Sequence, residues 1–270
     1  MKMWRRDKFM KISVLIRLMK ADFMKMKHTW FYWIHICIPL IGAAVFLLYY
    51  SAAPWKAVDK ISGYFEALCL AFPILIGIVC EMVIEKESEA GRFKEMLSLQ
   101  YGKGICFLSK ILILLISGLI SLFAAVSVFF IGFQYILNQN ILPVSFYMIG
   151  IGIVFIAQVF IYIFHIGISI RFGRGASIGM GIFEMLVAAL LETGLGDGIW
   201  QMVPCSWAVR FIEIYFINAG SFMNTAETFS AVKFFMENCM TGFRNCIIFT
   251  LILGIFSAIW FKSFEGSKIA

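Results

Sequence analysis

Long apolar runs alternate with short polar connections along almost the whole chain. The 60 residues between Lys110 and Arg171 contain no Asp, Glu, Lys or Arg. A membrane-spanning helix needs roughly 20 apolar residues, so this stretch has the length of two spans, and its polar segment 134–143, which ends in Pro143, predicts the turn between them. The pattern predicts an all-α integral membrane protein with six transmembrane helices, at about residues 30–50, 64–84, 105–133, 144–170, 176–191 and 243–261.

The region that follows the fifth predicted span does not continue the pattern. Residues 192–207 contain three glycines and a proline, and the apolar run at 214–226 is too short to cross a bilayer. We expect residues 192–240 to form an extracellular re-entrant or interfacial region, with the run at 214–226 as a helix in the outer leaflet, and the fifth span itself to be re-entrant or broken. Cys205 and Cys239 both fall in this region, so a disulfide between them is an open possibility.

Composition and charge support this class and add an orientation. Hydrophobic residues make up 61% of the chain and charged residues only 14%, whereas about 25% is usual in soluble domains. With the N-terminus inside, 18 of the 23 Lys and Arg residues fall on the cytoplasmic side and 5 outside, as the positive-inside rule requires. The sequence therefore predicts that both termini are cytoplasmic, and its net charge of +7 indicates topology and anionic lipid rather than nucleic acid.

The N-terminal segment, residues 1–29, is strongly basic. Its apolar residues recur at steps of three and four, as expected for one face of a helix: Phe9, Ile12, Leu15, Ile16, Met19, Phe23 and Met26. The pattern predicts an amphipathic helix on the inner leaflet; the alternative is a solvated charged tail. Because the apolar run at 30–50 is as long as a full span, we expect an uncleaved anchor and not a signal peptide. Residues 263–270 are expected to form a short cytoplasmic tail.

The charged stretch EKESEAGRFKEMLSLQYGKG, residues 85–104, lies between the second and third predicted spans. Carboxylates crowd its beginning, where they suit the positive end of a helix dipole. Phe93, Met96 and Leu97 fall on one helical face. We expect a short cytoplasmic helix at about 85–97 whose apolar ridge fits a groove on a partner. The alternative is that the ridge rests on the membrane surface.

The segment EKESEAGRFKEMLS resembles the cytoplasmic loop of ABC-2-type exporter permeases, in which an E-x-E…G-x-x-x-x-L-L motif follows the second span. The six-span layout, the amphipathic N-terminal helix and the large loop before the sixth span are also similar. More narrowly, the chain resembles the G-type permease of lantibiotic self-protection transporters. It departs from the motif where Met96-Leu97 replaces Leu-Leu and where the proline that often follows is missing.

The resemblance implies a non-catalytic permease subunit in the bacterial plasma membrane that removes membrane-active antimicrobial peptides. It also implies a second, non-identical permease and two copies of a separate ABC ATPase, which binds ATP and Mg and moves the coupling helix. The residues that the resemblance assigns to ATPase docking are Glu85, Glu87, Glu89, Arg92, Phe93, Met96 and Leu97. The sequence contains no G-x-x-x-x-G-K-[ST] motif, so we expect no cofactor in this chain.

Other functions remain open at this point. The chain could export another amphiphile, such as a lipid, drug or glycan, or sense peptide without transporting it. An intramembrane enzyme is disfavoured, because the sequence has neither H-E-x-x-H nor E-E-x-x-x-R and only three histidines; we expect no catalytic residues and no metal site.

Two carboxylates fall inside predicted spans. Glu184 lies well within the fifth span, where a carboxylate is costly and is either functional or part of a structural hydrogen bond between helices. Glu81 is near the inner end of the second span, where we expect its side chain to reach the interface. His165 has no acidic residue at helical spacing and is expected to be a buried histidine satisfied within the bundle.

Overall fold

The computed structural model describes residues 2–89, 91, 93–98, 102–221 and 229–266. Within these ranges the chain forms nine α-helices, one π-helical turn and three 3-10 helices, and the described residues include no strand. Six helices are long and apolar enough to cross a membrane. The protein is therefore an all-α integral membrane protein, as predicted.

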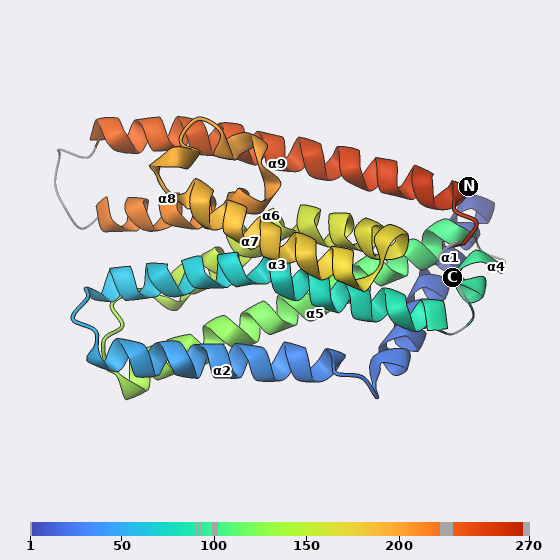
Figure 1. Ribbon diagram of the computed structural model, residues 1–270, viewed down its shortest axis with the longest axis horizontal. Coiled ribbons are helices and arrows are strands. Elements are labelled where there is room, and N and C mark those ends of the chain that lie inside the picture. The colour runs from blue at the N-terminus through green and yellow to red at the C-terminus, as the bar shows by residue number, and fades with distance from the viewer. Residues whose placement is uncertain (1, 90, 92, 99–101, 222–228, 267–270) are drawn as a thin grey trace.

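The six membrane-crossing helices lie side by side along the longest axis of the molecule (Figure 1). They are α2 (Phe31–Ala52), α3 (Ala57–Glu89), α5 (Lys103–Ile131), α6 (Val144–Phe172), α7 (Arg174–Glu192) and α9 (Phe229–Ser263). The predicted spans match them, but α3 is longer at both ends than the apolar run from which it was predicted, and α9 begins 14 residues before the predicted sixth span. A π-helical turn at Gly132–Ile136 prolongs α5.

The two ends of the bundle differ in composition. One end carries α1 (Lys2–Met26), α4 (Lys94–Ser98) and the α6–α7 turn with Arg171 and Arg174 (Figure 1); we call it the basic end. The other end, called the opposite end, carries the α2–α3 and α5–α6 connections. The positive-inside rule predicts that the basic end is cytoplasmic.

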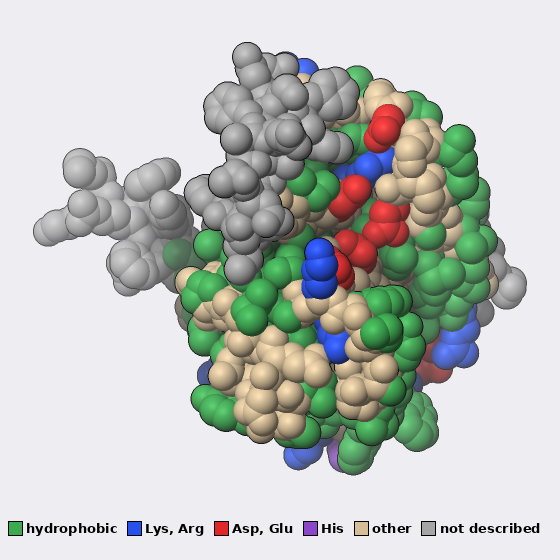
Figure 2. All heavy atoms as spheres, turned by 90° about the vertical axis from the view of Figure 1, so that its left-hand side faces the viewer, with side chains coloured by type: hydrophobic (Ala, Val, Ile, Leu, Met, Phe, Trp, Pro, Cys, Tyr) green, Lys and Arg blue, Asp and Glu red, His purple; other side chains and the backbone are tan. Residues whose placement is uncertain are grey.

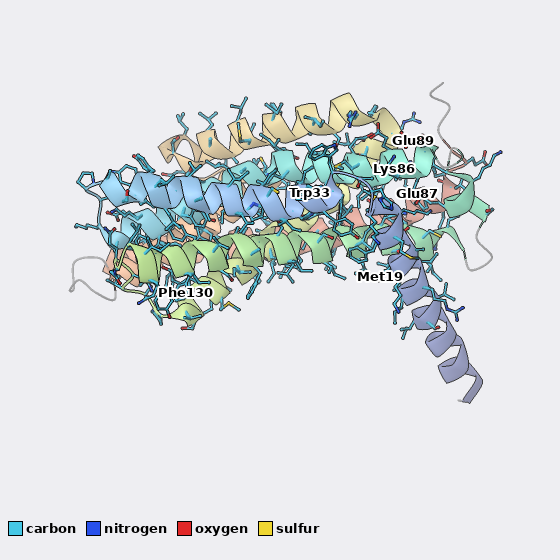
Figure 3. All side chains as sticks on the ribbon, turned by 90° about the horizontal axis from the view of Figure 1, so that it is seen from below. Met19, Trp33, Lys86, Glu87, Glu89 and Phe130 are labelled. Carbon is cyan, nitrogen blue, oxygen red and sulfur yellow. The ribbon has the colours of Figure 1, made fainter. Side chains whose placement is uncertain are left out.

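Helix α1 leaves the bundle at an angle, and only its second half packs against the other helices (Figure 3). Asp22 and Met26 are buried there, as is Val14, whereas Ile12 and Ile16 are about half exposed. The predicted N-terminal helix is thus present. Its exposed apolar residues suit a membrane surface, and that location stays a prediction.

Helix α3 runs through the centre of the bundle and packs against α6, α7 and α8. Glycines let the backbones of α3 and α7 touch: a Cβ atom at Gly77 would lie 2.7 Å from the carbonyl oxygen of Ser177, and one at Gly181 would lie 2.6 Å from that of Pro73. Small residues at such contacts are typical of helix pairs in membranes. The α3–α7 spacing is therefore fixed by backbone contact.

Helix α7 is unbroken, contrary to the expectation of a broken or re-entrant fifth span, and the chain becomes irregular only after Glu192. Three 3-10 helices (Gly194–Gly196, Trp200–Met202 and Pro204–Ser206) lead into α8 (Trp207–Ser221). The irregular chain is held by Arg210, which is 4% exposed and donates hydrogen bonds to the backbone carbonyls of Leu191 and Thr193.

The helix predicted at 214–226 in the outer leaflet is described only in part. Its residues 214–221 belong to α8, where Ile214 and Phe216 are 4% exposed because the helix packs between α3, α6 and α9; residues 222–226 lie outside the described residues. Cys205 and Cys239 are both free thiols, so the structure contains no disulfide between them. Burial raises the pKa of Cys205 to about 12, which keeps this thiol protonated and unreactive.

Candidate functional site

The segment that connects α3 to α5 differs from the single helix predicted for residues 85–97. Glu85, Glu87 and Glu89 lie in the last turns of α3, and a separate five-residue helix, α4, begins at Lys94. Gly91 has φ +127° and lets the chain turn, while the amide of Phe93 donates to the carbonyl of Glu87 at 3.2 Å, as in a helix C-cap. The carboxylates therefore end a helix instead of beginning one.

The apolar ridge predicted for this segment points into the protein. Phe93 and Met96 are 3% and 2% exposed, and the ring of Phe93 packs edge-to-face on Phe264, with centroids 5.7 Å apart. The expectation that they form an outward ridge is wrong, because both side chains are buried and Phe264, which follows α9, covers Phe93. Leu97 is half-buried, and Arg92 lies outside the described residues.

Polar side chains form the outward surface of the same segment. Glu89 and Lys94 are exposed, and Glu85 is partly exposed. Lys86 pairs with Glu89 at 2.6 Å on the surface. These charged groups are accessible from outside the bundle at the basic end.

Glu87 belongs to a buried group of four charges, which we call the ion cluster: Asp22, Lys25, Glu87 and Lys110. The ammonium group of Lys110 donates to Asp22 and, at 2.5 Å, to Glu87. Lys25 donates to Glu87 at 2.9 Å, and the hydroxyl of Ser109 donates to Asp22 at 2.6 Å. The formal charges of the four residues sum to zero.

The ion cluster joins three helices, since Asp22 and Lys25 come from α1, Glu87 from α3 and Lys110 from α5. Asp22, Glu87 and Lys110 are each at most 6% exposed. Figure 3 shows Glu87 near the point where α1 meets the bundle. Buried charges are tolerated only when paired with good geometry, so the cluster fixes where α1 docks.

Sequence reasoning placed Glu87 on a solvated rim and did not identify Asp22 or Lys110. The available signal was Lys110 itself: α5 begins at Lys103, so this lysine lies two turns inside an apolar helix. A lysine at such a place needs a carboxylate partner.

A second polar group lies deeper in the bundle. His165 of α6 contacts Glu184 of α7 through Nε2 at 2.9 Å and Ser177 of α7 through Nδ1 at 3.0 Å. The hydroxyl of Ser177 donates to the carbonyl of Gly77 in α3 at 3.0 Å. His165 is fully buried and Glu184 is 5% exposed. The hydrogen-bonding groups of His165 are thus satisfied within the bundle, as predicted. Its acidic partner, Glu184, lies on another helix, so helical spacing within α6 could not reveal it.

Glu81 corrects a further expectation, since its side chain does not reach the interface. It is 6% exposed, because α3 continues for two more turns beyond it. Its Oε2 atom has no hydrogen-bond partner among the described residues, and the hydroxyl of Ser169 lies close enough to interact with its carboxyl group.

Acidic side chains gather on the opposite end of the bundle, as Figure 2 shows. Glu66, Glu192 and Glu213, from α3, α7 and α8, lie close enough to interact. Arg210 pairs with Glu213 at 2.9 Å and with Asp197 at 3.0 Å. Burial raises the pKa of Glu213, and neighbouring Arg210 opposes that shift. Four carboxylates, those of Glu66, Glu192, Glu213 and Asp197, against one guanidinium leave this surface acidic.

The residues that the structure describes contain no group of three or more His, Cys, Asp or Glu side chains that could hold a metal ion.

Residues 18–188, more than half of the chain, match the family model described as ABC-2 family transporter protein. The chain belongs to the ABC-2 transporter family. The comparison with curated proteins and the comparison with solved structures found no match. The matched range includes the whole ion cluster and the His165–Glu184 pair, so both polar groups lie in the part of this ABC-2 protein that defines its family.

Membership gives the coarse function. ABC-2 proteins are membrane components of transporters, and the family implies a separate ABC ATPase as partner. The polar surface at Glu89 and Lys94, backed by the ion cluster, is the candidate site at which this chain would receive such a partner.

Proposed function

We propose that this ABC-2 protein is the permease subunit of an ATP-driven exporter that removes lantibiotic-type antimicrobial peptides from a bacterial plasma membrane and so gives immunity. In this proposal two copies of a separate ATPase bind ATP and Mg, and a second, non-identical permease completes the membrane part. The chain itself is non-catalytic. The observation that carries the proposal is the ion cluster, which links the α3–α4 segment to α1 and α5.

The ion cluster supports the α3–α4 segment as the contact with the ATPase. A force applied to the exposed Glu89 acts on the last turn of α3, two residues from Glu87. Because Glu87 is bonded to Lys110 and Lys25, the force is passed to α5 and α1 without an intervening flexible chain. Phe93 and Met96 keep α4 attached to the bundle while this happens. In this proposal docking depends on the charged outward residues.

The acidic opposite end supports a cationic peptide as substrate. A surface of one charge sign attracts ligands of the other sign and raises their local concentration. The carboxylates of Glu66, Glu192 and Glu213 lie at the predicted extracellular end, where a lantibiotic would arrive. An anionic lipid or glycan would be repelled by the same surface.

Reconstitution tests the proposal. The chain is co-expressed with an ABC ATPase and a second permease encoded beside it, and the purified complex is assayed for ATP hydrolysis with a cationic lantibiotic. We expect a stable complex whose hydrolysis rises with peptide. Equal stimulation by an uncharged amphiphile would favour another substrate class, and peptide binding by this chain without an ATPase would favour a sensor.

A charge exchange tests the docking surface. Glu89→Lys with Lys94→Glu reverses two exposed charges and keeps the net charge, so folding should be unaffected and co-purification of the ATPase should fall. The matched control is Glu66→Lys at the opposite end, which should keep the ATPase and reduce peptide stimulation. If the exchange keeps full ATPase binding, the ATPase docks elsewhere.

A further inference from the structure

Polar side chains line one junction inside the membrane part, where α3, α6 and α7 meet. Each helix contributes residues on the same face, spaced by whole turns: Gly77, Glu81 and Glu85 on α3, His165 and Ser169 on α6, and Arg174, Ser177 and Glu184 on α7. The line begins at the basic end, where Glu85 faces Arg174 at 3.6 Å. It ends in the bundle at the His165–Glu184 pair.

The hydrogen bonds of this pair determine how many protons it holds. Ser177 has a single hydroxyl hydrogen, and it is donated to the carbonyl of Gly77. The contact between Ser177 and Nδ1 of His165 therefore needs a hydrogen on Nδ1. Nε2 of His165 and the Glu184 carboxyl, 2.9 Å apart, would then be two facing acceptors unless a second proton lies between them. The observed geometry thus holds one proton more than a neutral imidazole beside a carboxylate.

Glu81 lies between this pair and the basic end. Glu81 is only 6% exposed. Its Oε2 atom has no hydrogen-bond partner among the described residues. An ionised carboxylate without a partner is costly in an apolar interior, so the neutral acid suits this place. The hydroxyl of Ser169 lies beside it, close enough to interact with the carboxyl group.

We propose that the α3–α6–α7 junction is a proton-binding site, in which Glu81 and the His165–Glu184 pair each hold one proton that exchanges with the basic end past Glu85. The other titratable groups that face this line are Cys80 on α3, Tyr162 on α6 and Cys205 beside α7. The inference depends on neither the peptide substrate nor the ATPase.

Loss of one proton from the His165–Glu184 pair changes a contact between helices. The proton on Nδ1 leaves to water, and the electron pair of that N–H bond stays on Nδ1, which becomes an acceptor. The proton between the ring and the carboxylate stays on Nε2, facing Glu184. The hydroxyl of Ser177 turns from the Gly77 carbonyl to Nδ1, so the hydrogen bond between α7 and α6 reverses its direction and the hydrogen bond between α7 and α3 is lost. Proton binding at this site is thereby linked to the α3–α7 contact.

Dicyclohexylcarbodiimide tests the proposal on the full chain in membrane vesicles. This apolar reagent adds to a protonated carboxyl group: the acid oxygen bonds to the carbodiimide carbon, and the acid proton moves to nitrogen. Mass spectrometry of the purified protein locates the adduct. We expect Glu81 to be modified several-fold more than Glu85, a matched carboxylate one turn away that is partly exposed and paired. Equal modification of the two would overturn the assignment of a proton to Glu81.

The pair is tested with His165→Leu, which removes the partner of Glu184. We expect Glu184, protected in the natural protein, to become several-fold more reactive, because its carboxyl then holds the proton alone. The matched control is Ser169→Ala on the same face of α6, which leaves the pair intact. Both variants are compared only as membrane-inserted protein that elutes as a single species. Equal Glu184 reactivity in the two variants would overturn the shared-proton assignment.

The route of exchange is tested by sidedness. Vesicles of known orientation are buffered differently on their two faces before reaction. We expect Glu81 modification to fall as the buffer at the basic end becomes alkaline and to ignore the buffer at the opposite end. Dependence on the opposite end would overturn the proposed entry past Glu85.

Discussion

Replacing Lys110 by methionine removes one positive charge from the ion cluster and keeps a side chain of similar length. Asp22 and Glu87 would then remain buried with Lys25 as the one other cation of the cluster, and the Lys25 side chain is 33% exposed. The formal charge of the cluster changes from zero to −1. We expect α1 to detach from the bundle, since two of the bonds that hold Asp22 and Glu87 are lost.

The magnitude follows from burial. Removing one partner of a buried ion pair costs about 3–5 kcal/mol, because the other charge stays buried without compensation. Since about 1.4 kcal/mol is a factor of ten, the equilibrium for detaching α1 should rise by roughly two to four powers of ten. The double variant Lys110→Met with Glu87→Gln should recover part of this loss, because it removes an opposing charge as well.

Hydrogen exchange of the amides in residues 18–26 measures this equilibrium, since these amides exchange when α1 opens locally. The matched control is Lys86→Met, which removes a lysine from an exposed pair with Glu89, where both side chains are at least 40% accessible. Such a pair contributes about 0–1 kcal/mol, so exchange in α1 should hardly change. Equal exchange in the two variants would show that the ion cluster does not hold α1.

Three further predictions rest on other parts of the structure. Gly181→Ala should lower the melting temperature of the purified protein and reduce the free energy of unfolding by about 1–3 kcal/mol, because its Cβ would lie 2.6 Å from a backbone carbonyl of α3. Gly175→Ala should leave the melting temperature unchanged, because a Cβ atom at Gly175 would have no neighbour within 4 Å. Phe93→Ala should cost about 3–5 kcal/mol of stability, whereas Lys94→Ala should stay within about 0.5 kcal/mol and weaken ATPase binding instead. A cysteine at position 103 should resist an impermeant thiol reagent in intact cells, while one at position 194, which is exposed and has open space for a side chain, should react, in a background without other cysteines; labelling at 103 would contradict the predicted orientation.

The membrane-spanning helices could be predicted from the sequence because one local quantity, the length of an apolar run, determines them. The charge-free stretch 111–170 predicted α5, α6 and the turn between them to within a few residues at most helix ends. The start of α3 at Ala57 was missed, because Asp59 and Lys60 are polar and yet lie inside the helix. Lys60 is 2% exposed and donates to the carbonyl of Tyr50 and the side chain of Gln139, partners that lie 10 and 79 residues away along the chain.

The candidate site was harder to predict, because its contacts join distant segments. The spacing of Phe93, Met96 and Leu97 showed a shared face, but spacing cannot tell whether that face meets a partner or the chain's own C-terminal residues. Gly91 is the one local sign in this segment that the helix breaks, because a glycine readily takes a positive φ angle. His165 and Glu184 are 19 residues apart, and only the register of α6 against α7 brings them together.

The chain order of the ion cluster bears on how the protein is made. Asp22 and Lys25 emerge from the ribosome first, and Glu87 follows. Until the third membrane helix is made, Lys25 is the one cation of the cluster, because Lys110 lies in that helix. Since domains assemble as the chain emerges, α1 has no complete docking site until α5 has been synthesised. During that interval its basic and apolar faces are free to hold the nascent chain on the membrane surface. Docking of α1 therefore depends on Lys110, the last of the four charges to be made, and follows the insertion of three spans.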